Sequence, residues 1–381
     1  MNILVDVRLL GRESMSGVGE YASLLTTELI KSAPEHSFKL FYNGWRKNPP
    51  PFLWTERKNV EIIDWNLPNK FFNLSSKLFN RPNLEKIARP DIVFSPHLQS
   101  LSLKNTPRVL TIHDLSFLHY PSFFTKSQRF WHFLQNCRIQ AEKASHIITD
   151  AEFTKSDIID FFKIPPEKIS VVCPGVNPDF RVISEEKDKD NLGKFKKKHG
   201  LLNPYLLFLG SFEPRKNLLA VISAFNEIKK EKDFSSLELV LAGSKEWLFG
   251  EAKKEIFSSP FRNFIKIKND IVPSERVFLY NEAKAFLYPS FFEGFGFPPL
   301  EAESCGIPVI AGNRSSLPEI LGDSAILIDP WKFSELVSAV KKIMLEKDLS
   351  AELSRRGLEN VKKFSWPSSA SKILKILSSQ I

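Results

Sequence analysis

The sequence predicts an α/β fold built from two parallel-sheet domains of the Rossmann type. Short apolar runs of strand length alternate with helical segments in both halves of the chain, as in successive βαβ units. The length of 381 residues suits two domains rather than one. A highly charged stretch poor in aromatic residues indicates a linker at 182–202. The expected domains are therefore 1–181 and 203–364, with a last helix over 365–381.

The first half carries one series of strands and helices. Apolar residues recur at helical spacing over 19–31, and a second helix is expected over about 153–162. The expected strands are residues 3–7, 38–42, 92–94, 109–112, 146–149 and 169–172. This alternation predicts a parallel sheet with helices on both faces.

The second half repeats the pattern. Its expected strands are residues 205–209, 237–242, 264–267, 285–288, 308–310 and 325–328, and its closing helices are residues 333–345 and 350–364. Ligands of such sheets bind at the carboxyl ends of the strands. Because clefts between domains commonly hold ligands, we expect the two sheets to face each other across a deep cleft that contains the site.

Composition and charge exclude several classes of protein. No apolar run approaches the length of a membrane span, and the N-terminus lacks the features of a signal peptide, so a cytoplasmic location is expected. The three cysteines have neither metal-ligand nor disulfide spacing and are expected to be buried thiols. The net charge of +9 fits an anionic small ligand, an anionic membrane surface or nucleic acid. No nucleic-acid-binding module is recognisable, so no nucleic-acid partner is expected, and solvated side chains account for most of the charge.

The most informative stretch contains two carboxylates, Glu293 and Glu301, with Gly294 and Gly296 after the first. The glycines and the apolar run behind them predict a loop that turns sharply into a helix, whose N-terminus favours an anion. Carboxylates accept hydrogen bonds from hydroxyls. A ligand with both phosphate and hydroxyl groups, a nucleotide sugar, therefore fits this stretch. From the spacing alone, an ordinary loop with two solvated glutamates fits equally well.

Two other turns carry residues suited to phosphate. Gly17, Val18 and Gly19 precede the first expected helix, where glycines let the backbone approach an anion. The turn lacks the G-x-G-x-x-G pattern, which disfavours an NAD site and leaves an ordinary strand–helix turn as the alternative. Arg215 and Lys216 follow the first strand of the second domain, where two cations would neutralise a leaving diphosphate. A solvated basic turn is the alternative, and the position at a strand end favours function.

A histidine follows a strand of the first domain. His113 comes directly after the strand at 109–112, where it could donate to a substrate hydroxyl or carry a proton. His97 is a second candidate of the same kind. The alternative for both is a structural histidine.

Together these segments resemble the retaining nucleotide-sugar glycosyltransferases of the GT-B fold, in the large family 4. The resemblance runs nearly end to end, and its markers are residues 16–21, 113–115, 174–177, 210–217, 293–301, 305–309, 317–319 and 364–366. The stretch 111–118 is similar to bacterial mannosyltransferases of surface polysaccharide assembly. The resemblance implies that residues 1–181 bind the acceptor, that 203–364 bind the nucleotide sugar, and that 365–381 cross back to the first domain.

The resemblance also implies roles in the first domain and at the basic turn. Gly17, Val18 and Gly19 would lie against the diphosphate and the sugar. His113 would contact the donor sugar near the reacting carbon, and Arg215 and Lys216 would stabilise the leaving diphosphate. Among the other markers, Glu293 would bind hydroxyls of the donor sugar, Glu301 would hold the ribose, and the sugar and phosphate would meet the backbone of Gly294, Phe295, Gly296 and Phe297.

One position departs from many relatives, which carry a basic residue where this chain has Ser211. Diphosphate binding would then depend more on Arg215 and Lys216. The family needs no metal and no cofactor, because protein cations and helix ends stabilise the charge. The pair Asp188 and Asp190 lies in the charged linker and is expected to be solvated.

The resemblance implies transfer of a hexose to an acceptor hydroxyl with retention of anomeric configuration. GDP-mannose is the favoured donor, and UDP-glucose, UDP-galactose and UDP-N-acetylhexosamines remain open. A phosphorylase of the same general fold would need a longer chain and usually a pyridoxal phosphate lysine. A non-catalytic sugar-nucleotide-binding protein would not need the whole set of residues.

The acceptor is expected on the first domain. Residues 66–89 and 127–143 interleave basic and aromatic side chains, including Phe130, Trp131 and Phe133 beside Arg129 and Arg138. This mixture suits an anionic membrane surface, and hence a lipid-linked glycan at the inner face of the cytoplasmic membrane. Ordinary amphipathic helices packed on their sheet explain it equally well.

Overall fold

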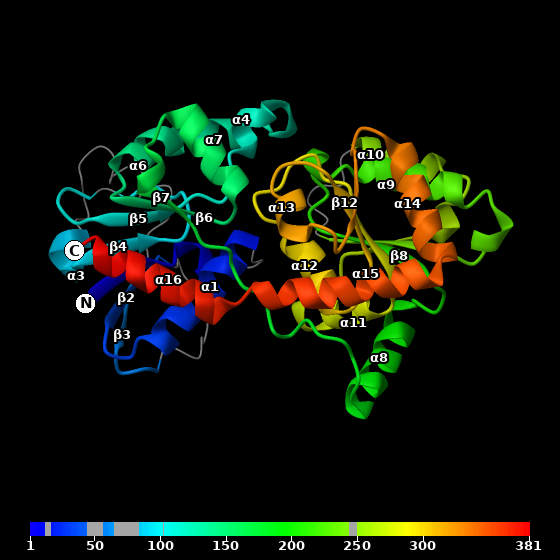
Figure 1. Ribbon diagram of the computed structural model, residues 1–381, viewed down its shortest axis with the longest axis horizontal. Helices are drawn as coiled ribbons and strands as arrows, with labels where there is room; N and C mark the ends of the chain where they lie inside the picture. The colour runs from blue at the N-terminus through cyan, green and yellow to red at the C-terminus, as the bar shows by residue number, and fades with distance from the viewer. Residues whose placement is uncertain (12–16, 44–55, 65–83, 102, 244–249) are drawn as a thin grey trace. The chain divides into compact units, whose positions relative to one another are not determined.

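The computed structural model describes residues 1–11, 17–43, 56–64, 84–101, 103–243 and 250–381. By their internal contacts these residues form two compact units (Figure 1). Unit 1 comprises Met1–Gly175 together with Phe364–Ile381, and unit 2 comprises Val176–Lys363.

Unit 1 is built on a parallel sheet of seven strands among the described residues, in the order β3-β2-β1-β4-β5-β6-β7. The strands are β1 (Asn2–Asp6), β2 (Ser37–Tyr42), β3 (Val60–Asp64), β4 (Ile92–Ser95), β5 (Arg108–Thr111), β6 (His146–Thr149) and β7 (Ile169–Val171). All six predicted strands are confirmed. β3 was not predicted, because Ile63 is the only buried residue of this edge strand and the strand lacks a continuous apolar run.

The described helices of unit 1 are α1 (Gly17–Ser32), α3 (Leu84–Ala88), α4 (Ser116–His119), α5 (Lys126–Gln135), α6 (Cys137–Lys143), α7 (Glu152–Phe162) and α16 (Trp366–Ser379). α16 lies along α1 (Figure 1). The ring of Trp366 meets that of Tyr21 edge-on at 5.8 Å, and the Ser369 hydroxyl donates to the Cys173 carbonyl at 2.6 Å. The last helix of the chain is therefore part of the first sheet's unit.

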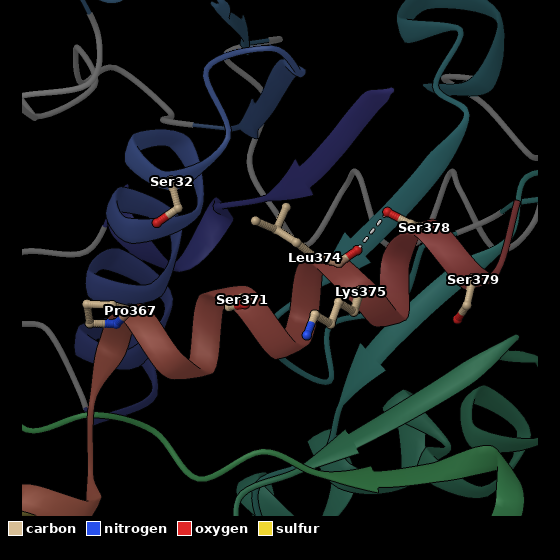
Figure 2. A pocket seen from close by; sticks show the side chains of 7 residues that line it. All are labelled: Ser32, Pro367, Ser371, Leu374, Lys375, Ser378 and Ser379. Carbon is tan, nitrogen blue, oxygen red and sulfur yellow. Dashed lines mark hydrogen bonds between the residues drawn. The ribbon is translucent and has the colours of Figure 1, made fainter.

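Figure 2 shows a pocket of about 570 Å³ that α1 and α16 form together. It is lined by Ser32, Pro367, Ser371, Leu374, Lys375, Ser378 and Ser379. The Ser378 hydroxyl donates to the Leu374 carbonyl of its own helix at 2.9 Å. None of the residues predicted at a functional site lines this pocket.

Unit 2 has a parallel sheet of six strands among the described residues, in the order β10-β9-β8-β11-β12-β13. The strands are β8 (Tyr205–Leu209), β9 (Glu238–Ala242), β10 (Ile265–Lys268), β11 (Ala283–Tyr288), β12 (Val309–Gly312) and β13 (Ile326–Ile328). All six were predicted. The described helices are α8 (Glu186–His199), α9 (Leu218–Ile228), α10 (Gly250–Ser258), α11 (Arg276–Asn281), α12 (Phe297–Ser304), α13 (Leu317–Leu321), α14 (Phe333–Leu345) and α15 (Lys347–Asn360).

The charged segment 182–202 contains a helix of unit 2. α8 is followed by Gly200, whose φ of 63° favours glycine. Ion pairs attach the helix and the segment before it, from Arg181 to Asp188 at 2.6 Å and from Lys196 to Glu282 at 2.6 Å. Asp188 is therefore paired rather than simply solvated.

Each sheet reverses its strand order once. The reversal lies between β1 and β4 in unit 1 and between β8 and β11 in unit 2. In open parallel sheets, ligands bind beyond the carboxyl ends of the strands at such a reversal. The turns after β1, β4, β8 and β11 are therefore where functional side chains are expected.

Candidate functional site

The loop after β11 enters α12 through a glycine. Gly296 precedes the helix with a φ of 109°, a conformation that other residues rarely adopt. Gly312, at the end of β12, lets this loop pass close by, because a Cβ there would lie 2.3 Å from the Ser290 carbonyl oxygen. The predicted loop that turns sharply into a helix is confirmed.

Two serines of the neighbouring turn after β12 hold this loop. The Ser315 hydroxyl lies 2.8 Å from the backbone N–H of Glu293, which donates to it. The Ser316 hydroxyl lies 2.9 Å from the Glu293 carbonyl and 3.0 Å from the Phe295 carbonyl. The backbone of Glu293 is thus fixed on both sides.

The Glu293 carboxylate is bound by the two predicted cations. Arg215 donates to one of its oxygens at 2.9 Å, and the Lys216 ammonium donates to the other at 2.7 Å. Burial raises the pKa of Glu293, but Arg215 and Lys216 outweigh burial and bring that pKa to about 2. Glu293 is therefore ionised throughout the physiological pH range.

The cations come from a short turn after β8. The 3-10 turn Pro214–Lys216 ends at Asn217, whose φ is 57°. Lys216 is only 5% exposed, and its ammonium also donates to the hydroxyl of Tyr288. Burial, and then Arg215, lower the pKa of Lys216, while Glu293 opposes that shift.

A second carboxylate, Glu213, holds Arg215 from the other side. The Arg215 Nε donates to Glu213 at 2.7 Å, and the Ser211 hydroxyl donates to the same carboxylate at 2.9 Å. The two positive charges of Arg215 and Lys216 are thus balanced by the two negative charges of Glu213 and Glu293. Ser211 therefore joins this cluster through its hydroxyl.

Glu301 lies on α12 and is only 5% exposed. Its carboxylate accepts a hydrogen bond from the Tyr280 hydroxyl at 2.7 Å, and Arg276 lies 4.0 Å from its other oxygen. Burial, and then Glu301, raise the pKa of Tyr280, so its hydroxyl keeps its proton. The carboxylate of Glu301 is therefore fixed in orientation.

His113 follows β5 in unit 1, and acceptors face both of its ring nitrogens. Nδ1 lies 2.6 Å from an Asp150 oxygen, and Nε2 lies 2.9 Å from the Pro96 carbonyl. Burial lowers the pKa of His113, but Asp150 and the Pro96 carbonyl outweigh burial and leave it raised. Only the doubly protonated ring can donate both hydrogen bonds.

The predicted phosphate turn lies inside α1. Gly17, Val18 and Gly19 form the first turn of the helix and do not precede it, because α1 begins at Gly17. A Cβ at Gly17 would meet nothing within 4 Å. The same helix carries Tyr21, whose ring meets that of His113 edge-on at 4.7 Å. The helix that begins with the predicted phosphate turn therefore contacts His113.

His97, the second histidine candidate, is 2% exposed. Its Nε2 lies 3.5 Å from Asp6, whose carboxylate is held by Arg8 at 2.6 Å and 2.8 Å. Burial lowers the pKa of His97. It belongs to a buried ionic cluster at the ends of β1 and β4, as expected for a structural histidine.

Several residues of these sites were not predicted. Asp150 follows β6 as His113 follows β5, so its position at a strand end was an available signal. Tyr280 and Tyr288 gave no signal, because in sequence they are indistinguishable from core residues. The partnership of Arg215 with Glu293, 78 positions away, likewise depends on the fold.

Other features bear on the expected classes. In the described part of the chain, no helix is long and apolar enough to cross a membrane, and no cluster of three metal-ligating side chains occurs. Cys137 and Cys305 are buried and Cys173 is half-buried, all as free thiols. Burial raises the pKa of Cys137 to about 12, as expected for an inert thiol.

Two all-parallel sheets with charged side chains beyond their strands define a protein of the GT-B class. A sucrose-phosphate synthase of Thermosynechococcus elongatus has the same fold, with a TM-score of 0.77, 17% identity and coverage of 99% of this chain and 98% of that one. A glycosyltransferase of Rickettsia africae gives a TM-score of 0.73 at 19% identity, over 99% and 98% of the two chains.

Two family models match the chain along most of its length. "Glycosyltransferase Family 4" matches residues 15–180, and "Glycosyl transferases group 1" matches residues 188–360. The chain belongs to these glycosyltransferases.

The curated relatives include mannosyltransferases. The chain is 29% identical to O-antigen chain mannosyltransferase B of Escherichia coli over 68% of this chain and 66% of that protein. It is 25% identical to the serotype-specific mannosyltransferase WbdA of Escherichia coli over 97% of this chain and 47% of that protein. It is 26% identical to the O-antigen chain mannosyltransferase RfbU of Salmonella typhimurium over 68% of this chain and 67% of that protein. The chain thus spans less than two thirds of the length of the two Escherichia coli relatives.

Proposed function

We propose that this protein transfers a hexose from a nucleotide diphosphate sugar to a hydroxyl of a glycan in cell-surface polysaccharide synthesis. The observation that carries the proposal is the binding of Glu293 by Arg215 and Lys216 beside the strand reversal of unit 2. A carboxylate that accepts hydroxyls and two cations that attract a diphosphate then lie in direct contact.

Donor binding would exchange partners within this cluster. The diphosphate brings negative charge to Arg215 and Lys216 and competes with Glu293 for them. Glu293 would then accept hydrogen bonds from hydroxyls of the donor sugar. The orientation of Glu301 by Tyr280 suits an acceptor for the ribose hydroxyls, while the backbone of Gly294, Phe295, Gly296 and Phe297 would meet sugar and phosphate.

The proposed transfer retains the anomeric configuration. The acceptor oxygen forms a bond to the anomeric carbon on the face from which the diphosphate departs, and the departing phosphate oxygen takes the acceptor's proton. Arg215 and Lys216 stabilise the charge that develops on the leaving group, so no metal is required. Retention of full activity in the presence of a chelator is the expected result.

In unit 1, Gly17, Val18 and Gly19 are proposed to meet the diphosphate and sugar, and His113 the donor sugar near the reacting carbon. Both N–H groups of His113 already donate within the unit. A sugar hydroxyl could accept from Nε2 only by displacing the Pro96 carbonyl.

GDP-mannose is the favoured donor, because the printed names of the relatives are those of mannosyltransferases. A UDP-hexose is the alternative, since a structural neighbour with a TM-score of 0.72 is described in complex with UDP-glucose. A thermal-shift panel of GDP, GDP-mannose, UDP, UDP-glucose and UDP-N-acetylglucosamine distinguishes them, because ligands of the folded state raise its melting temperature. Shifts with the guanosine compounds alone support the proposal, shifts with the uridine compounds alone replace the donor, and no shift overturns nucleotide-sugar binding.

The proposed acceptor is a glycan or lipid-linked glycan at the inner face of the cytoplasmic membrane. The O-antigen names of the relatives support a polysaccharide acceptor. Of the two predicted acceptor segments, residues 66–83 lie outside the described residues, and α5 and α6 cover most of the other. Transfer of radiolabelled mannose to lipid-extractable glycan in membrane fractions is the direct test.

A further inference from the structure

Helix α5 turns its apolar side chains away from unit 1. Phe130 is 61% exposed, Phe133 76%, Leu134 41% and Trp131 38%. These four residues occupy one side of a helix of ten residues. Elsewhere in the described chain, large exposed apolar residues such as Phe257 on α10 and Trp331 occur without comparable clustering on one helix face.

The opposite side of α5 is polar and faces the protein. Gln135 is buried and accepts hydrogen bonds from the backbone N–H and hydroxyl of Ser100 at 2.9 Å and 3.0 Å. The ring of His132 stacks on Phe117 at 4.2 Å, and burial lowers the pKa of His132. Surface helices normally bury their apolar side, so α5 is amphipathic in the inverted sense. An exposed apolar helix side of this kind marks a surface that interacts with a membrane, a ligand or another protein.

The charges of residues 126–143 are almost all positive. Lys126 and Arg129 are exposed on α5, which contains no acidic residue. α6 adds exposed Arg138 and Lys143, and the only acid of residues 126–143, Glu142, is paired with Arg138 at 2.8 Å. Four cations and one acid leave this segment with a net charge of +3.

The charge pattern distinguishes the possible occupants. A second copy of this chain packed symmetrically on α5 would bring Lys126 and Arg129 against the same cations of its partner. An anionic bilayer instead attracts each cation, and aromatic side chains are stabilised at its headgroup level. We propose that α5 and the exposed part of α6 form a docking surface for anionic phospholipid membranes, with Phe130, Trp131 and Phe133 inserted among the headgroups.

This inference rests on the proposed function in one respect. Docking would be useful because it brings the protein to a lipid-linked acceptor. The exposed apolar side of α5 and the positive charges beside it are observed whether or not the protein has that function. Insertion of the aromatic residues supplies the apolar part of the binding free energy. Each cation increases the affinity for an anionic surface roughly fivefold. Binding should therefore need both negative lipid and low salt.

The test is flotation of the full-length protein with phosphatidylcholine vesicles, either pure or with roughly 30 mol % phosphatidylglycerol, a content that gives a negative surface potential. We expect binding to the mixed vesicles alone, and its loss at high salt. The double variant Phe130→Ser/Phe133→Ser should lower the bound fraction at least about tenfold, because two large apolar groups no longer insert. Lys126→Gln/Arg129→Gln should weaken binding by roughly 25-fold.

The matched control is Phe257→Ser, which removes a phenylalanine that is 62% exposed on unit 2 and should leave vesicle binding unchanged. Absence of wild-type binding, equal binding to pure phosphatidylcholine, or equal loss in the control overturns the inference. Sedimentation equilibrium without vesicles adds a further outcome. A dimer abolished by the Phe130→Ser/Phe133→Ser variant would assign the surface to a second copy instead.

The two proposals fail separately. Nucleotide thermal shifts should be the same in the α5 variants and the wild type, which also shows that the variants are folded. Vesicle binding without any nucleotide shift overturns the proposed function alone. A nucleotide shift without vesicle binding overturns the docking surface alone.

Discussion

The turns beyond the two sheets hold their charged side chains in different ways. In unit 2, Glu293 is bound by Arg215 and Lys216, and its pKa lies near 2. In unit 1, His113 bears a positive charge only while its ring holds two protons for Asp150 and Pro96. In the first arrangement Glu293 stays ionised throughout the physiological pH range, whereas the second depends on the protonation of a histidine, whose pKa is raised by Asp150 and the Pro96 carbonyl.

The comparison separates two roles that the proposed reaction requires: binding of the diphosphate and positioning of the sugar. Cations suit the diphosphate of the donor, in which both phosphates are esterified and keep the same charge near neutral pH. A histidine that is held by acceptors on both sides suits positioning rather than proton transfer. The largest expected effects therefore lie in unit 2, and pH-dependent effects are expected in both units.

The largest effect is expected at Glu293. Glu293→Gln removes the negative charge and one of the two oxygens that would accept from the sugar hydroxyls, and it releases Arg215 and Lys216 from their carboxylate. Transfer should fall by about 100- to 1,000-fold, whereas the affinity for the nucleoside diphosphate should stay the same or rise. Measurements of the transfer rate and of nucleotide binding by calorimetry test this separation, and unchanged turnover would contradict the assignment of the site.

Lys216→Ala should weaken binding of the nucleoside diphosphate by about 10- to 100-fold, because a buried charge-assisted contact is lost. Lys229→Ala is the matched control. Lys229 is also a buried lysine of unit 2, but it donates to the carbonyl of Phe234 at 3.0 Å. The control should lose stability and keep nucleotide affinity, and equal loss of affinity in both variants would remove Lys216 from the site.

Glu303 sharpens the comparison within unit 2. It is buried like Glu293, but none of the cations that the structure describes forms an ion pair with it, and burial raises its pKa to about 7. Its carboxyl meets Asn360 at 2.9 Å and the Ser324 hydroxyl, which also donates to the Leu321 carbonyl at 2.6 Å. A protonated Glu303 can donate to Ser324 and so satisfy both groups.

The folded-state pKa of Glu303 lies above its ordinary value of 4.5. Its contribution to stability is therefore complete below pH 4.5 and is lost as the pH rises through about 7. Glu303→Gln does not ionise, so the free energy of unfolding of the wild type relative to this variant should fall by on the order of 3 kcal/mol between those limits. Denaturant unfolding at mildly acidic and mildly alkaline pH measures the difference, and a constant difference would be inconsistent with a neutral buried carboxyl.

The smallest effect is expected at His113. Its folded-state pKa is raised, so its contribution to stability is fully present below 6.5 and is lost as the pH rises through the folded-state value. His113→Gln should cost about 1–2 kcal/mol in mildly acidic solution, the scale of hydrogen bonds from a charged group, and less in alkaline solution. The opposite trend in urea unfolding would mean that the folded ring is neutral.

Strands and the Glu293–Glu301 loop could be predicted because their signals are local. Apolar runs of strand length identified all but β3, and glycine beside an acid identified the turn into α12. What the sequence could not provide is pairing across distance, such as Arg215 with Glu213 and Glu293. The orientation of α5 was open for the same reason, since its periodicity does not say which side meets the sheet.

The assignment of α16 to unit 1 has a consequence for biosynthesis. A ribosome must produce residues 176–363 before it reaches the helix that packs along α1. At ordinary elongation rates this takes roughly 10–40 s. During that interval the side of α1 that α16 later covers meets water or a chaperone, so a pause late in translation would prolong the period in which the nascent chain can aggregate.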